Sequence, residues 1–224
     1  LPPEIGDGEM SVRTPTYNQL GADKAVRYFD RLLKASSRHM LLLDNFGLCA
    51  FPHEVMRLST LTELSLKVNS LRKLPPNIGE LPYLKKFNLE NNELETVHPA
   101  VGKLTQLAEL NLASNALRSV PVEIGRLQKT LTSMTLDDNP VAGALAELVA
   151  KGHEHVLTYL NLVMDARKSL EVNLSFQGFH AFPNEVLHIP GLQSLFLNDN
   201  QIREVPESLG PLMTALTDMD ISNN

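Results

Sequence analysis

Two histidines flank a glutamate at His153-Glu154-His155, and these are side-chain types that bind zinc. The segment is expected to begin a helix, where residues two positions apart point in different directions, so the two imidazoles diverge. No third ligand stands nearby. We therefore expect a solvated helix terminus here and no metal site.

The other residues that could carry chemistry are isolated. Cys49 is the single cysteine, so it forms no internal disulfide, and it is expected to pack in the core of a reducing-compartment protein. Asn173-Leu174-Ser175 matches a glycosylation acceptor by pattern only, because it falls in an expected strand. The sequence contains no Gly-Lys-Ser/Thr phosphate loop, no grouped Ser-His-Asp set and no Cys-His pair. We expect no catalysis and no cofactor.

Composition narrows the class of partner. The chain has 224 residues, 43% of them hydrophobic, and a net charge of -6. An acidic balance argues against nucleic-acid binding, which calls for a basic patch or stripe. No apolar run is long enough to span a bilayer, and the first ten residues do not read as a signal peptide. The expected location is intracellular and cytoplasmic, with an organelle or ciliary assembly left open.

The strongest signal is a repeat of 23 residues. In residues 61–83, leucines at fixed spacings lie on both sides of Asn69. Pro75 follows directly after Leu74. Shifting by 23 residues restores the pattern in the next two units. One earlier unit and two later units follow it as well. The landmark asparagines of these units are Asn69, Asn92, Asn115, Asn200 and Asn224.

This pattern resembles the leucine-rich-repeat family, whose signature is LxxLxLxxNxL. The LPxxIGxL half, present as LPPNIGEL and VPVEIGRL, is similar to the 23-residue intracellular class of Ras-associated, Scribble-like and plant Ras-group proteins. The resemblance covers roughly residues 38–148 and 169–224. Phe46 and Gln177 depart from it in the asparagine slot, and His98 replaces the proline. The resemblance implies an α/β solenoid with a parallel concave sheet, an irregular or 3-10 convex side and amphipathic helical inserts.

Elementary chemistry supports the same fold. The alternation Leu64-Ser65-Leu66 suits a strand with one buried face. The asparagines are expected inside a bend, where they satisfy backbone groups whose loss would cost about 1–3 kcal/mol each. Pro75, Pro121 and Pro206 are expected to fix the backbone as it leaves the bend.

A second, longer period is present. Residues 21–55 align without gaps on residues 152–186, a shift of 131. In each copy a glycine precedes an amphipathic helical pattern, with the apolar residues Val26, Phe29, Leu32 and Leu33 in the first. The expected division is a partial repeat and irregular segment at 1–20, a helix at 21–37, a first block at 38–148, a helical insert at 149–168 and a truncated second block at 169–224, all in one continuous solenoid.

Two interpretations of the insert stay open. In the first, the insert shifts the register of the repeats, and the apolar face of its helix is buried in the solenoid. In the second, the insert presents this helix to a partner. The segment from Asn139-Pro140 to Gly152 resembles one that closes a repeat block in intracellular family members. The chain opens inside a unit, because LPPEIG matches VPVEIG at 120–125, and it stops at an asparagine slot. These ends suggest a piece of a longer array.

The resemblance makes the concave sheet face the expected binding surface. Its outward positions carry ten acids against two lysines, which favours a protein partner with a basic or mixed surface. Exposed apolar side chains on the same face could anchor that partner. The candidate partner-binding residues are Leu42, Asp44, Glu63, Lys67, Lys86, Glu90, Glu109, Asp137, Phe176, Phe196, Asp199 and Asp218.

These observations favour a non-catalytic protein–protein interaction scaffold, a segment or subunit of a larger assembly. The alternative is the recognition arm of a signalling enzyme (a GTPase, kinase, phosphatase or ubiquitin ligase) whose catalytic domain lies outside this chain. A receptor ectodomain is disfavoured, since disulfide-bonded caps are missing and the repeats do not read LxGxIP.

Overall fold

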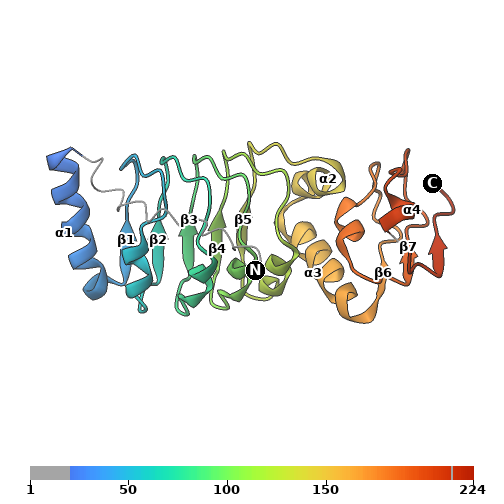
Figure 1. The fold of residues 1–224 in the computed structure, drawn as a ribbon, viewed down its shortest axis with the longest axis horizontal. Coiled ribbons are helices and arrows are strands. Elements are labelled where there is room, and N and C mark those ends of the chain that lie inside the picture. The colour runs from blue at the N-terminus through green and yellow to red at the C-terminus, as the bar shows by residue number, and fades with distance from the viewer. Residues whose placement is uncertain (1–20, 213) are drawn as a thin grey trace, which may run out of the picture.

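The computed structural model describes residues 21–212 and 214–224 as an elongated stack of chain turns (Figure 1). Helix α1 (Ala22–Arg38) lies at one end, and the C-terminal strand lies at the other. Two further helices, α2 (Gly143–Lys151) and α3 (His153–Ser169), sit between two groups of strands. The partial repeat expected at 1–20 lies outside the described residues.

All the described strands are three residues long and pair in parallel. A five-stranded sheet has the order β1-β2-β3-β4-β5, and a three-stranded sheet has the order β6-β7-β8. Within the first four strands each residue lies opposite the residue 23 positions later, as Glu63 lies opposite Lys86. The strands are β1 (Met40–Leu42), β2 (Glu63–Ser65), β3 (Lys86–Asn88), β4 (Glu109–Asn111), β5 (Ser133–Thr135), β6 (Glu171–Asn173), β7 (Ser194–Phe196) and β8 (Asp218–Asp220).

Most connections between successive strands carry a short 3-10 helix, and η3, η4 and η5 pack on one another. Pro75 and Pro121 precede η3 and η5 in extended conformation. At η4, His98 stands in the proline slot, and its Nδ1 accepts a hydrogen bond from Ala100 N at 3.1 Å. The 3-10 helices are η2 (His53–Arg57), η3 (Pro76–Glu80), η4 (Pro99–Lys103), η5 (Val122–Leu127) and η6 (Asn184–His188). The predicted α/β repeat solenoid is confirmed.

Helices interrupt this pattern at two places. α1 and α3 each have 17 residues, start 131 positions apart and end at a residue in the left-handed conformation, His39 and Leu170. α2 packs against α3, and a fourth short helix, α4 (Leu209–Leu212), follows β7. Because α2 and α3 occupy the connection from β5 to β6, these two strands do not pair.

The core is one cluster made mostly of leucines, and the inward positions of β1 to β7 are buried in it, whereas Met219 on β8 is partly buried. Two expectations about buried residues were wrong. Cys49 is exposed, because it lies in the bend after β1 rather than at a leucine position. On α1 the buried residues are Tyr28 and Ala35, whereas Val26 and Leu33 of the expected stripe are exposed.

The interior role predicted for the asparagines is confirmed. Asn92 is buried, and its Nδ2 donates to Leu66 O at 3.0 Å and to Leu89 O at 2.9 Å. Its Oδ1 accepts from Leu71 N at 3.0 Å. One side chain thus links backbone groups of two successive turns. The same arrangement recurs at Asn69, Asn115, Asn139, Asn200 and Asn224.

Among the described residues, no helix combines the length and the apolar character needed to cross a bilayer.

Candidate functional site

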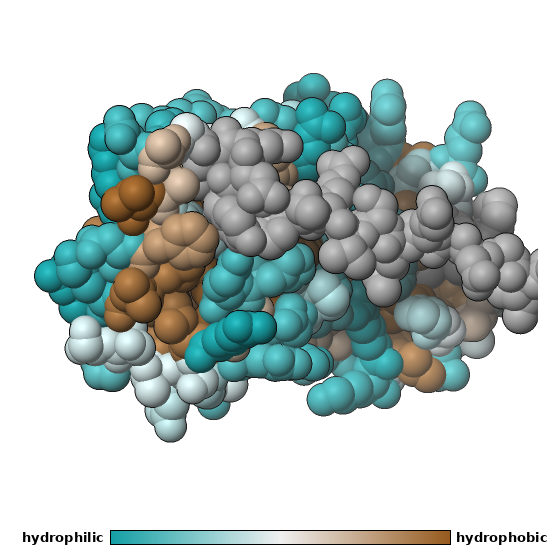
Figure 2. Space-filling model, turned by 60° about the vertical axis from the view of Figure 1, so that its left-hand side comes forward, coloured by the Kyte–Doolittle hydropathy of each residue, from teal (hydrophilic) through white to brown (hydrophobic). Residues whose placement is uncertain are grey.

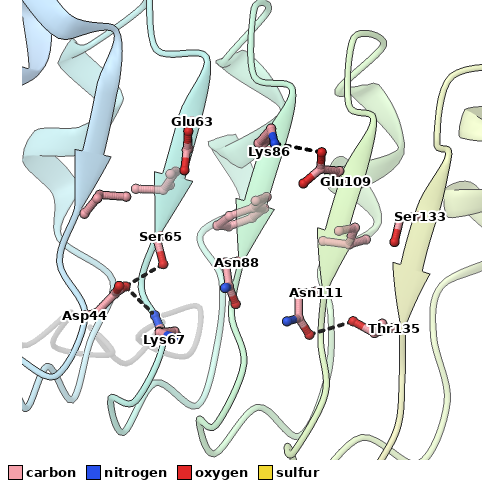
Figure 3. Close-up of a pocket in the computed structure, with 14 residues that line it drawn as sticks. Asp44, Glu63, Ser65, Lys67, Lys86, Asn88, Glu109, Asn111, Ser133 and Thr135 are labelled. Carbon is pink, nitrogen blue, oxygen red and sulfur yellow. Dashed lines mark hydrogen bonds and ion pairs between the residues drawn. The ribbon is translucent and has the colours of Figure 1, made fainter.

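The outer face of the five-stranded sheet holds a shallow groove of about 430 Å³, here called the sheet groove (Figure 3). Its lining includes Leu64, Phe87 and Leu110, the buried middle residues of three adjacent strands. Polar side chains stand around them. The residues that line the sheet groove are Leu42, Asp44, Glu63, Leu64, Ser65, Lys67, Lys86, Phe87, Asn88, Glu109, Leu110, Asn111, Ser133 and Thr135.

Strand geometry arranges the polar side chains in two rows. The first and third residues of each strand point to the same face, and the parallel register places equivalent positions opposite one another. Both rows run across the strands (Figure 3). The first row is Glu63, Lys86, Glu109 and Ser133, and the second is Ser65, Asn88, Asn111 and Thr135.

The first row carries three of the charged side chains of the sheet groove, Glu63, Lys86 and Glu109. Lys86 Nζ lies 2.8 Å from Glu109 Oε1, and both side chains are about half exposed. The hydrogen bond to Glu109 and the attraction of its charge raise the pKa of Lys86, and Glu63 adds to this in a smaller degree. The row therefore holds two carboxylates and one ammonium group, which pairs with Glu109, and it keeps an excess of negative charge.

The second row is held in place by hydrogen bonds within the sheet groove. Thr135 Oγ1 donates to Asn111 Oδ1 at 2.6 Å, and Asn111 Nδ2 donates to Glu90 Oε2 at 3.1 Å. At the β1 end, Asp44 Oδ1 accepts from the hydroxyl of Ser65 and from Lys67 N. Ser65, expected as an outward position, is buried by this contact. These bonds fix the side chains of Asn111 and Thr135 relative to each other and tie Ser65 to Asp44.

The structure divides the twelve sequence candidates between the two sheets. Leu42, Asp44, Glu63, Lys67, Lys86 and Glu109 line the sheet groove, and Glu90 joins it through Asn111. Asp137 follows β5 on the same sheet and is exposed. The remaining four lie on or after strands of the three-stranded sheet and are Phe176, Phe196, Asp199 and Asp218.

Those four residues belong to a separate sheet, since β5 and β6 are unpaired. Phe176 is 75% exposed, and Phe196 is partly covered. Asp199 accepts hydrogen bonds from Asn198 Nδ2 at 2.7 Å and from Asn223 Nδ2 at 2.9 Å. Its carboxylate is thus held within its own sheet, while Asp218 is exposed at the start of β8.

Five polar residues of the sheet groove stand outside the twelve candidates. They share outward strand positions and small or amide side chains, and they are Ser65, Asn88, Asn111, Ser133 and Thr135. The signal that could have found them is their position in the repeat, one residue on either side of the buried strand residue.

The arrangement suits hydrogen bonding and ion pairing along a strip rather than bond-breaking chemistry. Within residues 21–212 and 214–224, no group of three or more His, Cys, Asp or Glu side chains is placed to hold a metal ion. His155 of the His-Glu-His segment is exposed on the first turn of α3.

Comparison with known proteins agrees with this geometry. Family profiles described as leucine rich repeat match residues 59–117 and 191–212. These matches identify leucine-rich repeats in both parts of the chain. Leucine-rich repeats are typically non-catalytic modules that mediate protein–protein interaction. No curated protein matches the chain.

Solved structures of similar proteins include a leucine-rich-repeat protein from Leptospira interrogans, with 27% identity and a TM-score of 0.47. This alignment covers 81% of the present chain and 54% of that protein. The BIR3–SERK2 complex from Arabidopsis thaliana shows 29% identity over 46% of this chain and 57% of that one, with a TM-score of 0.42. The GASSHO1/SCHENGEN3 receptor-kinase ectodomain from Arabidopsis thaliana, in complex with CASPARIAN STRIP INTEGRITY FACTOR 2, shows 26% identity over 84% of this chain and 19% of that one, with a TM-score of 0.41. The chain thus spans less than two thirds of each.

Proposed function

We propose that this chain is a protein-binding module of the intracellular leucine-rich-repeat class, and that it binds a basic segment of a partner in the sheet groove. The observation that carries the proposal is the first row, in which Glu63 and Glu109 flank a single Lys86. Complementary charge speeds association and selects partners more than it adds raw affinity. In this proposal the module is a non-catalytic scaffold within a larger assembly.

The second row supplies the specificity of the proposed contact. Asn88 is partly exposed, and its Oδ1 accepts from Glu90 N at 3.0 Å, so its amide nitrogen faces the groove with donors to offer. Asn111 and Thr135 are fixed by their mutual bond. A partner backbone could therefore exchange hydrogen bonds with a rigid strip, which limits the entropy lost on binding.

The test starts from a random peptide library displayed on phage and selected on the full chain. Peptides enriched in Lys and Arg are expected. Their affinity should fall at least about tenfold, or 1.4 kcal/mol, in the triple variant Glu63→Lys, Glu90→Lys, Glu109→Lys.

The matched control changes three exposed acids outside the sheet groove to lysine, which reverses their charge. They are Glu80, Glu95 and Glu204. This control variant should bind the same peptides as the unaltered chain does. Equal affinity of the peptides for both triple variants would reject the sheet groove as the binding surface.

A further inference from the structure

Helices α1 and α3 are equivalent parts of two copies of one structural unit. Tyr28 Oη donates to Glu54 Oε2 at 3.1 Å, and 131 positions later Tyr159 Oη donates to Glu185 Oε2. Both tyrosines are buried, and both helices are followed by a three-residue strand. The inner faces of the two helices therefore dock on their own blocks in the same way.

The outer face of α3 is covered by the preceding block. α3 packs along η5, and its Leu157 and Leu160 are at most 1% exposed. The approach is so close that a Cβ on Gly125 would lie 2.4 Å from Asn161 N. At the edge of this contact, Arg167 Nη1 pairs with Glu123 Oε1 at 2.6 Å.

The outer face of α1 is open at the equivalent positions. Val26, which corresponds to Leu157, is 69% exposed, and Leu33, which corresponds to the partly buried Met164, is 80% exposed. Figure 2 shows a hydrophobic patch at this end of the molecule. Within the part of the chain that the structure describes, no turn equivalent to η5 precedes α1.

The sequence holds one candidate for that missing turn. Residues 1–6 read LPPEIG, and residues 120–125, which lead into and form most of η5, read VPVEIG. The two stretches agree at the proline, the glutamate, the isoleucine and the glycine. In η5 the glycine lets the chain approach α3 closely, and the glutamate pairs with Arg167. Glu4 corresponds to Glu123, and Gly6 corresponds to Gly125.

We propose that the outer face of α1 binds the LPPEIG segment of residues 1–6, as the outer face of α3 binds η5. Gly6 would approach Asp30, which corresponds to Asn161 and lies nine positions after Gly21. That is about 14 Å along the helix, whereas the connection from Gly6 to Gly21 can extend to roughly 50 Å. The connection is therefore long enough. In this arrangement α1 is an internal helix between two repeat units and not the terminal cap of the solenoid.

Zero-length carbodiimide coupling tests the proposal in the full chain. Ser36→Lys places an amine where α3 has Arg167, so it should couple to Glu4. The reference is Arg167→Lys, which should couple to Glu123. Both products are identified by peptide mass spectrometry on an equal mixture of isotopically light and heavy chains.

The expected result is a 4–36 link in which both peptides carry the same isotope label. Ile5→Asp, and separately Val26→Asp with Leu33→Asp, should abolish this link and leave the 123–167 link intact. Absence of the 4–36 link while the 123–167 link forms would overturn the proposal. A 4–36 link that joins light to heavy chains would also overturn it, because a second copy would then supply the segment.

Discussion

Lys86 on β3 and Glu109 on β4 form an ion pair of 2.8 Å across the middle of the sheet groove. Glu63 lies opposite Lys86 on the other side, so one ammonium group stands between two carboxylates. The first row therefore has a net negative charge, and the size of this charge depends on whether Lys86 is present.

Removing Lys86 should strengthen the binding of a basic peptide. Lys86→Gln frees Glu109 for the partner, whereas Glu109→Gln leaves Lys86 to repel it, so the two variants should shift the affinity in opposite directions. Isothermal titration at low and at high salt measures this, and the difference should shrink at high salt because exposed charges are screened. A shift in the same direction for both variants would contradict the assigned roles.

Asn92→Ala should destabilise the solenoid strongly. The change removes three hydrogen bonds and leaves Leu71 N without its partner in a buried bend, while Leu66 O and Leu89 O keep the amides of Asn69 and Asn115. The expected loss is about 1–3 kcal/mol in the free energy of unfolding. Urea denaturation followed by circular dichroism measures it. Asn184→Ala, at an exposed asparagine, is the control and should change the value by less than about 0.5 kcal/mol.

Gly125→Ala should loosen the joint between the first block and α3. The added Cβ would meet backbone atoms of Leu160 and Asn161 at 2.4–2.7 Å, which no side-chain rotation relieves. A loss of about 1–3 kcal/mol is expected. Hydrogen exchange should rise first in α3 and η5. Gly210→Ala, where the new Cβ meets nothing within 4 Å, should show no loss; equal losses at both sites would rule out a close contact at Gly125.

Glu147 should make the contact between α2 and the second block sensitive to acid. Burial raises the pKa of this carboxyl, but the hydrogen bonds from the backbone N–H groups of His180 and Ala181 and from the His180 ring outweigh it, so the pKa is lowered. A lowered folded-state pKa stabilises the fold above the ordinary value of 4.5, and this contribution is lost as pH falls through the lower value.

Comparing unfolding free energies at pH 7 and pH 3.5 checks this prediction. The unaltered chain should lose more stability on acidification than Glu147→Gln, which lacks the titrating group. Glu80→Gln, at an exposed position, should behave like the unaltered chain. If Glu147→Gln lost as much stability as the unaltered chain, the carboxylate would have no such role.

Much of this fold could be predicted from the spacing of a few residue types. Leucines repeated every 23 residues specify a buried strand position in each turn, and an asparagine inside each bend has one way to satisfy the backbone, so the solenoid and the role of Asn92 were predictable. The exposure of Cys49 and Val26 was not, because the pattern says which residues are apolar but not which neighbours cover them.

The candidate site was predictable in its position but not in its detail. Outward strand positions follow from the alternation around Leu64, and this places Glu63 and Lys86 on one face. The pairing of Lys86 with Glu109 and of Asn111 with Thr135 depends on side-chain rotamers and on the distance between strands. The separation of the two sheets depends on how α3 packs on η5, which no local spacing encodes.

Photo-crosslinking from inside the sheet groove tests the proposed binding surface most directly. A benzophenone amino acid replaces Asn88 in the middle of the second row, and in a matched variant it replaces the exposed Glu80 outside the groove. Each variant is irradiated with the peptide selected from the library. The predicted result is a covalent adduct from position 88 and none from position 80. An adduct from position 80 with none from position 88 would contradict binding in the sheet groove.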